Sequence, residues 1–225
     1  MLKISIIIPV LNEAGHLEEV LKQALGFQDE ELELIVVDGG SNDDTVAVAK
    51  RHTGQVVVSD RGRAKQMNAG ADVANGDILL FLHADTVLSI DSCELIKSKI
   101  SNDHHQWGRF DVRLSGDNKL FRIIEFFINW RSRISSIATG DQAIFVCRKL
   151  FDEIGGFPEM PLMEDIEISK RLKRVSKPIC ITSAVITSTR RWEEHGILRT
   201  VLLMWQLRFL YFIGVSPERL IKHYR

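Results

Sequence analysis

The chain has 225 residues, with 29 Lys or Arg against 30 Asp or Glu, a formal net charge of −1 at pH 7. This length suits one domain that can bury a core without stabilising disulfides or metal ions. The near-neutral charge provides no global attraction to nucleic acid or an anionic membrane. The three cysteines (Cys93, Cys147 and Cys180) are far apart and match no metal-site spacing, so we expect structural thiols in a reducing compartment.

The first 85 residues alternate between short apolar runs and helical patterns. Asn12 is the expected N-cap of the first helix, and Gly76 is the expected end of the third. The expected strands are 4–10, 32–37, 56–59 and 78–82, and the expected helices run to residue 25, to residue 51 and over 63–75. This alternation predicts a parallel, doubly wound sheet whose ligands bind beyond the carboxyl ends of the strands.

The first apolar run is too short for a signal peptide and is broken by Pro9, so we expect a cytoplasmic protein.

Polar residues follow each of these strands: 12–13, 38–40, 60–63 and 83–85. We expect them to gather at one sheet edge and form a binding site. Asp85 is the best candidate to hold Mg²⁺ or Mn²⁺, which would neutralise a diphosphate; a helix or turn cap is the alternative. His83 could be a ligand, a hydrogen-bond donor to sugar or phosphate, or a capping residue.

The chain contains neither GxGxxG nor GxxxxGK[ST], which argues against dinucleotide dehydrogenases and P-loop NTPases. Acidic residues at the strand ends instead favour hydroxyl-bearing groups and a hard cation.

The second half has a less regular pattern. Apolar and charged residues alternate over 109–114, which predicts a half-exposed strand with its charged face in solvent. We expect an amphipathic helix at 120–134, strands at 142–147 and 179–186, a helix from about 164 to 175 and a polar loop at 188–196. No repeat or linker separates the halves, so we assign residues 1–195 to one domain and 196–225 to a helical tail.

Residues 197–215 are apolar but contain Arg199 and Arg208. Each arginine would cost roughly 2.5 to 3.5 kcal/mol near a bilayer centre, which disfavours a membrane span. We expect an apolar helix that lies in the membrane interface or packs across the domain, followed by a short helix at 218–224. If this helix contacts a membrane, we expect the molecule on which the protein acts to be lipid-like, such as a polyprenyl, carotenoid or glycolipid alcohol.

Six ordered motifs resemble the family 2 glycosyltransferases with a GT-A fold, most of all their short bacterial members. The motifs are ISIIIPVLNE, VVDGGSNDDT, GRAKQMNAGA, DILLFLHADT, TGDQAIFVCRKLFDEIGGF and MEDIEISKRLK, and the match covers roughly residues 3–192. The resemblance implies a Rossmann-like, mostly parallel central sheet flanked by helices, a nucleotide-diphosphate sugar donor, Mn²⁺ or Mg²⁺, and inverting transfer to an acceptor hydroxyl.

The family's metal-binding Asp-x-Asp motif stands here as His83-Ala84-Asp85, so its metal-binding second position is Asp85 and its first is an imidazole. The resemblance places His195 as a third metal ligand, because GT-A enzymes often take one from late in the chain. The nucleotide-site residues that it implies are Pro9, Asn12, Glu13, Asp38, Arg63, Asn68 and His83.

The Glu164-Asp165 pair matches the family's ED motif, which implies that Asp165 is the catalytic base. Glu164 either positions Asp165 or is a helix-start acid stabilised by the macrodipole. Asp141 is a candidate for the acceptor side. Arg190, Arg191 and Trp192 offer a cationic pair and a stacking ring for diphosphate and sugar, with a solvated loop as the alternative.

Two other functions remain open from the sequence. A sugar-1-phosphate nucleotidyltransferase would need a glycine-rich, basic loop after the first strand, and PVLNEAGH has none. A non-catalytic sugar-nucleotide-binding protein is hinted at by His83, whereas Asp85 and Asp165 favour catalysis.

Overall fold

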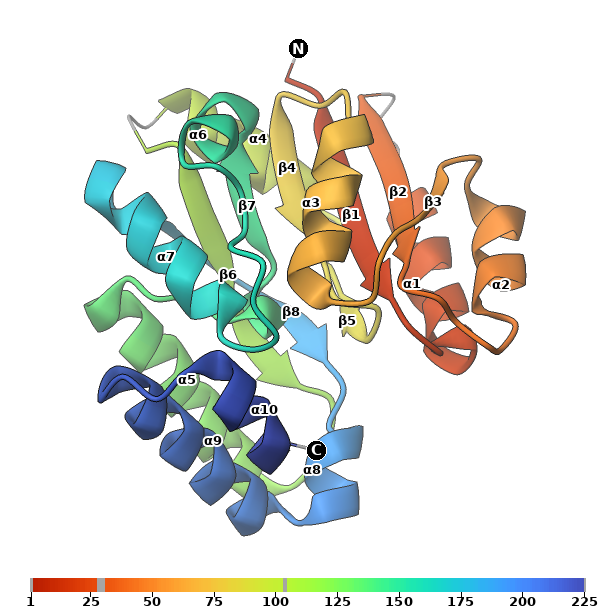
Figure 1. Cartoon of the computed structure of the whole chain (residues 1–225). Helices are drawn as coiled ribbons and strands as arrows, with labels where there is room; N and C mark the ends of the chain where they lie inside the picture. Colours follow the sequence, from red (N-terminus) through yellow and green to blue (C-terminus); the bar gives the residue numbers. More distant parts are fainter. Residues whose placement is uncertain (1, 28–30, 103–104, 225) are drawn as a thin grey trace.

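A computed structural model describes residues 2–27, 31–102 and 105–224, which fold around one eight-stranded sheet flanked by helices (Figure 1). The strands are β1 (Ile4–Val10), β2 (Leu32–Asp38), β3 (Val56–Val58), β4 (Ile78–Phe81), β5 (Thr86–Val87), β6 (Trp107–Leu114), β7 (Ile144–Cys147) and β8 (Ile179–Thr187). Their order is β3-β2-β1-β4-β7-β6-β8-β5. The neighbours β3, β2, β1 and β4 are parallel, while β7 pairs antiparallel with both β4 and β6.

Helices cover both faces of the sheet. They are α1 (Ala14–Leu25), α2 (Thr45–His52), α3 (Arg63–Val73), α4 (Ser92–Asn102), α5 (Lys119–Ser135), the 3-10 turn η1 (Gly140–Gln142), α6 (Arg148–Glu153), α7 (Glu164–Val175), α8 (Arg190–His195), α9 (Ile197–Phe212) and α10 (Pro217–Tyr224). Ile6 and Ile8 of β1 pack into the core with α1, α2 and α4, and Ile7 packs into the other core with α3, α6 and α7. The apolar run of β1 is therefore buried because alternate residues serve opposite faces.

The predicted strands and helices of the first half are present, but two boundary predictions were wrong. Asn12 is not the N-cap of α1: that position is Glu13, and Asn12 has a left-handed backbone with φ +56°. Gly76 does not end α3, which stops at Val73. A Cβ at Gly76 would lie 2.6 Å from the backbone nitrogen of Ser5, so glycine is needed there for close approach of the chain to β1.

The charged face of β6 is only partly in solvent: Arg113 is exposed as predicted, whereas Asp111 is half-buried. Phe110, Val112 and Leu114 are buried as expected, but Arg109 is also buried, at 1% exposed. Its guanidinium pairs with Asp111 and donates to the backbone carbonyl of Asn129 in α5. The prediction was therefore wrong for Arg109 and right for Arg113, because α5 packs over only part of the charged face.

The predicted polar loop at 188–196 contains the short helix α8, and that prediction was wrong. The carbonyl of Thr189 accepts from the backbone N–H groups of Trp192 and Glu193, and the Thr189 hydroxyl donates to the Glu193 carboxylate. Thr189, whose side chain is buried, therefore starts a turn that the polar composition alone did not indicate.

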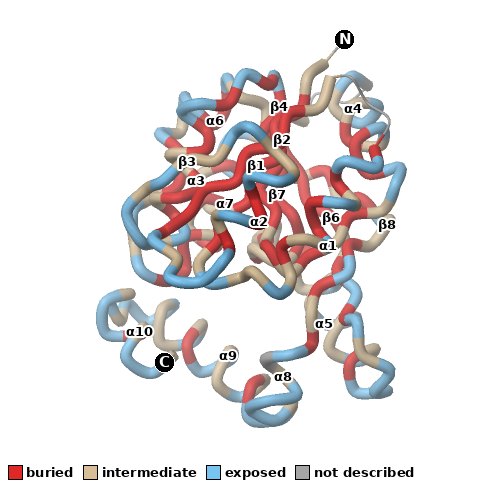
Figure 2. Tube along the Cα trace, turned by 90° about the vertical axis from the view of Figure 1, so that its right-hand side faces the viewer, coloured by how far each residue is buried: buried red, intermediate tan, exposed pale blue. Residues whose placement is uncertain are grey.

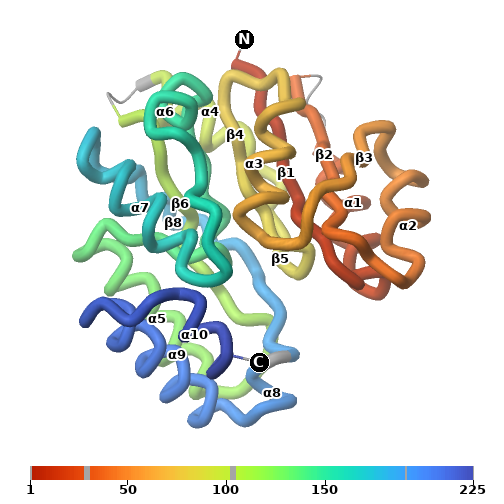
Figure 3. The backbone as a smooth tube through the Cα atoms, in the orientation of Figure 1, coloured from red at the N-terminus to blue at the C-terminus, as the bar shows by residue number. Residues whose placement is uncertain are grey.

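The C-terminal helices pack as a layer beside the sheet, which Figures 2 and 3 show from two directions. Leu207 of α9 and Leu220 of α10 are buried with Leu162, Met163 and Ile166 around the start of α7. Within the described ranges, no helix is long and apolar enough to cross a membrane.

A buried carboxylate in β2 predicts a pH-dependent stability. Burial alone would raise the pKa of Glu33, but hydrogen bonds from Asn75, Ser5 and Gln55 lower that pKa to about 2. Because the folded pKa lies below the ordinary glutamate value of 4.5, this stabilisation is complete above pH 4.5 and is lost as the pH falls through about 2.

We therefore expect Glu33→Gln to lower the free energy of unfolding at pH 7 by up to about 3 kcal/mol. The difference from wild type should shrink as the pH falls toward 2.5, which urea titrations across this range would measure. A difference that stayed constant with pH would show that the carboxylate charge does not stabilise the fold.

Candidate functional site

A cleft of about 580 Å³ opens at the carboxyl ends of β1 and β4. This volume falls within the range of small-molecule sites. The cleft is lined by Pro9, Val10, Leu11, Glu13, Arg61, Gly62, Arg63, Gln66, His83, Ala84, Asp85, Pro161, Leu162, Glu164, Ile221 and Tyr224. The polar ends of two neighbouring parallel strands meet here, because β1 and β4 stop at the same sheet edge.

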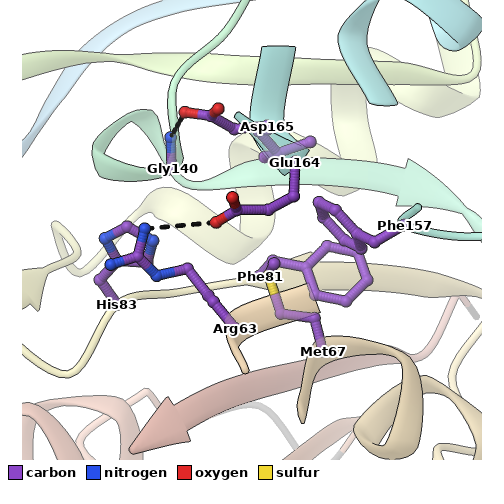
Figure 4. Close-up of a pocket in the computed structure, with 9 residues that line it drawn as sticks. Arg63, Met67, Phe81, His83, Gly140, Phe157, Glu164 and Asp165 are labelled. Atoms are coloured by element: carbon purple, nitrogen blue, oxygen red, sulfur yellow. Dashed lines mark hydrogen bonds and ion pairs between the residues drawn. The ribbon is translucent and has the colours of Figure 1, made fainter. Parts of the chain in front are cut away.

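A small cavity of about 10 Å³ adjoins the cleft and shares Arg63, His83 and Glu164 with it (Figure 4). Its apolar side is formed by Met67, Phe81, Ile144 and Phe157.

The ion pair between Arg63 and Glu164 crosses this cavity, with Nη1 3.3 Å from Oε1. Glu164 is 3% exposed, and burial raises its pKa although Arg63 opposes the shift. A buried carboxylate at the first position of α7 keeps its charge through such a partner. Arg63 and Glu164 thus join the N-terminal ends of α3 and α7 at the cleft.

The imidazole of His83 lies beside this pair (Figure 4). Burial, with a smaller contribution from the charge of Arg63, lowers its pKa to about 3, so the ring is neutral at pH 7. Its Nε2 is buried and has no hydrogen-bond partner within residues 2–27, 31–102 and 105–224. A neutral ring with a free nitrogen can donate to or accept from a ligand hydroxyl.

Asp165 is held at the second position of α7 by two backbone groups. Its Oδ2 accepts from the N–H of Gly140 at 3.1 Å (Figure 4). Its Oδ1 accepts from the N–H of Ile166 at 2.7 Å. A Cβ at Gly140 would lie 2.4 Å from Nε2 of His83. Glycine therefore lets η1 approach the end of β4 and places Asp165 beside the cavity.

Two carboxylates in the cleft fit a hard cation. Burial raises the pKa of Glu13, Arg190 opposes this, and the negative charge of Asp85 raises it further. Oε2 of Glu13 is buried with no hydrogen-bond partner among described residues, and it lies 3.8 Å from Nη2 of Arg190. A divalent cation would relieve this repulsion and use oxygen ligands of the kind that Mg²⁺ and Mn²⁺ prefer.

The described residues hold no group of three or more His, Cys, Asp or Glu side chains placed to bind a metal ion. His195, the last residue of α8, is thus not joined to Asp85 in such a group. A cation at Asp85 would need further ligands from a bound nucleotide or from water.

Three predicted nucleotide-site residues are not among those that line the cleft. Asp38 is buried and accepts from the backbone N–H groups of Gly40 and Ser41. The side-chain Oδ1 of Asn12 accepts from the backbone N–H of Asn42. The Asn68 amide both donates to and accepts from the backbone of Phe157. These side chains stabilise the loops that frame the cleft.

The predicted acceptor-side residues lie on η1 and α8. Asp141 follows Gly140, and burial raises its pKa while a hydrogen bond with Thr139 opposes the shift. Its Oδ1 is buried without a partner in the described structure. Arg190 pairs with the cleft residue Glu13, and Trp192 is half-buried on α8. The side chain of Arg191 lies outside the described residues.

Sequence reasoning missed Gln66 and the two residues from α10. The Gln66 amide donates to the carbonyls of Val10 and Val37, so it ties the ends of β1 and β2 together under the cleft. A glutamine among the small residues of α3 was the available signal. Ile221 and Tyr224 line the cleft because α10 folds back toward it, and no local pattern indicates that.

Solved structures with the same fold include a mannosyltransferase and a synthase. The mannosyltransferase PcManGT from Pyrobaculum calidifontis, in complex with GDP-Man and Mn²⁺, has a TM-score of 0.67 and 20% identity, covering 96% of this chain and 66% of that one. Glucosyl-3-phosphoglycerate synthase from Mycobacterium tuberculosis, in complex with Mg²⁺ and UDP, has a TM-score of 0.65 and 19% identity, covering 96% and 80%. At these identities the likeness shows a shared fold.

Curated relatives include the probable glycosyltransferase YdaM of Bacillus subtilis, 24% identical over 92% of this chain and 53% of that protein. A PGL/p-HBAD biosynthesis glycosyltransferase of Mycobacterium bovis is 40% identical over 37% of this chain and 36% of its own length. The chain therefore spans about half or less of these relatives. The model of the family "Glycosyl transferase family 2" matches residues 5–157, more than half of the sequence. The chain belongs to glycosyl transferase family 2.

Proposed function

We propose that the protein is an inverting glycosyltransferase that moves a sugar from a nucleotide-diphosphate sugar to an acceptor hydroxyl. The observation that carries this proposal is Asp165, whose carboxylate is fixed by two backbone N–H groups beside a cleft large enough for a nucleotide sugar. The fold neighbours in complex with GDP-Man and with UDP support a donor of this class.

The donor would lie in the cleft, with its diphosphate toward Asp85 and Glu13. These two carboxylates would hold Mn²⁺ or Mg²⁺, and the bound cation would neutralise the leaving diphosphate. Arg63 lines the same cleft and adds a positive charge on the donor side. Pro9 borders the nucleoside from β1, and Asp38 and Gln66 keep the loops after β1 and β2 in place.

The acceptor hydroxyl would approach Asp165, which takes its proton as the oxygen attacks the anomeric carbon. Glu164 is already paired with Arg63, so we assign it to positioning α7 and not to proton transfer. Neutral His83 offers its free Nε2 to a sugar hydroxyl, and Asp141 offers its unpartnered Oδ1 on the acceptor side. In-line attack with a single displacement inverts the anomeric configuration.

In this proposal residues 1–195 perform the transfer and residues 196–225 form an appended helical tail. The apolar character of α9 favours a lipid-like acceptor at the cytoplasmic face of a membrane.

The test is to incubate the purified protein with UDP-, GDP-, dTDP- and CDP-sugars, each with Mn²⁺ or Mg²⁺ and with EDTA as the control. We expect metal-dependent release of one nucleoside diphosphate, by slow hydrolysis without acceptor and faster with a suitable alcohol. A donor that binds but is never cleaved with any acceptor would favour a non-catalytic binding protein.

A further inference from the structure

An apolar stripe runs along the exposed side of α5. Phe126 is 61% exposed, Phe127 51%, Trp130 52% and Ile134 67%. Phe127, Trp130 and Ile134 are three and four residues apart, a spacing that places them on one side of the helix. The opposite side of α5 covers β6.

A second stripe runs along α9. Leu198 and Leu202 are each 70% exposed, Trp205 is 69%, Phe209 62% and Phe212 87%. Their spacings of three and four residues again place them on one side, while Leu207 faces the buried cluster with α10 and the start of α7. Isolated exposed apolar residues are ordinary, but two continuous stripes of this kind mark an interaction surface.

The two helices belong to one layer on the same side of the molecule (Figures 1 and 2). Arg131 of α5 and Arg208 of α9 lie close enough to interact: burial and, to a smaller extent, the charge of Arg208 lower the pKa of Arg131 to about 10. We call the exposed sides of α5 and α9 the apolar face.

The layer that carries the apolar face is strongly basic. Helices α5, α9 and α10 together contain eight Lys or Arg and two Glu, a net charge of +6. Since the whole chain has a net charge of −1, the remainder carries −7. The same helices therefore carry both the excess positive charge and the exposed aromatic residues, a combination suited to an interface between apolar lipid chains and anionic headgroups.

We propose that the apolar face docks on the surface of an anionic lipid bilayer, with the aromatic side chains of α5 and α9 inserted at the headgroup boundary. A second copy of the chain is a poorer occupant, because a two-fold contact would set the positively charged helices of one copy against those of the other. Ile221 and Tyr224 of α10 line the cleft, and α10 packs on α9, so docking brings the cleft beside the bilayer. Delivery of a lipid-like acceptor to that cleft rests on the proposed function, whereas docking itself does not.

The test is co-sedimentation with phosphatidylcholine vesicles, with and without phosphatidylglycerol. We expect binding to the anionic vesicles that weakens with rising salt. Two double variants should each weaken binding at least about tenfold. They are Trp205→Glu with Phe209→Glu on α9, and Phe127→Glu with Trp130→Glu on α5. Arg199→Glu should weaken binding about fivefold or more, since each basic residue near an anionic surface contributes on the order of 1 kcal/mol.

Val58→Glu and Ile90→Glu are the matched controls, because these side chains are 72% and 71% exposed but lie outside the apolar face. They should bind vesicles like wild type, and circular dichroism should show all variants folded. Two results would overturn the proposal: wild type that does not sediment with anionic vesicles, or α5 and α9 variants that bind as well as the controls. If the wild-type protein instead does not bind vesicles but forms a dimer, and the same variants are monomers, the occupant of the apolar face is a second copy of the chain. None of these readouts depends on transferase activity.

Discussion

Replacing Asp165 with Asn is expected to lower kcat for sugar transfer by about 10² to 10⁴-fold, the usual contribution of a general base. The amide cannot take the proton of the acceptor hydroxyl, yet it has nearly the same shape as the carboxylate. Donor affinity should change little, because Asp165 is not among the residues that line the cleft. Steady-state kinetics would measure the first effect and a thermal shift with the donor the second.

Asp152→Asn is a matched control, since this exposed residue of α6 lines neither the cavity nor the cleft. It should keep wild-type kinetics. If the Asp165 variant keeps full activity, another group takes the proton and the assignment of the base is wrong. If it loses activity together with donor binding and thermal stability, Asp165 instead organises η1 and α7 through its bond from Gly140.

Replacing Asp85 with Ala is expected to remove the metal-dependent part of donor binding. At a donor concentration of 100 Kd, ligand binding should raise the Tm of the wild-type protein by about 5 to 10 °C when Mn²⁺ or Mg²⁺ is present. The variant should show little of this shift, because Glu13 alone leaves the cation and diphosphate poorly held. The measurement is a thermal-shift panel of nucleotide sugars, each with and without metal.

Asp60→Ala serves as the control, because Asp60 lies after β3 near the same sheet edge but is not a cleft residue. Its donor-dependent shift should equal that of wild type. A full metal-dependent shift in the Asp85 variant would mean that the cation is held elsewhere. A shift that does not depend on metal in either protein would mean that Arg63 and neighbouring groups neutralise the diphosphate without a cation.

Local patterns were sufficient for the regular elements of the first half. The apolar runs of β1, β2 and β4 are buried on both faces, and a short run of this kind has few other stable placements. Predictions from local sequence patterns were wrong where the packing partners come from distant parts of the chain. Arg109 sits on the alternating polar face of β6, yet α5 covers it and supplies a carbonyl. Gly76 is a close-approach glycine and not a helix stop.

By itself the sequence determined the alternation of strands and helices, the sheet edge where polar residues collect, and the motifs of the family. These depend on local burial and on the parallel pairing that such alternation requires. The tertiary structure alone decided which polar groups face the cleft and which make hydrogen bonds within the fold. Asp38 and Asn68 make internal hydrogen bonds, while the buried Nε2 of His83 has no hydrogen-bond partner in the part of the chain that the structure describes. The tertiary structure also places α10 at the cleft, because this placement follows from long-range packing of Leu220 that no local spacing encodes.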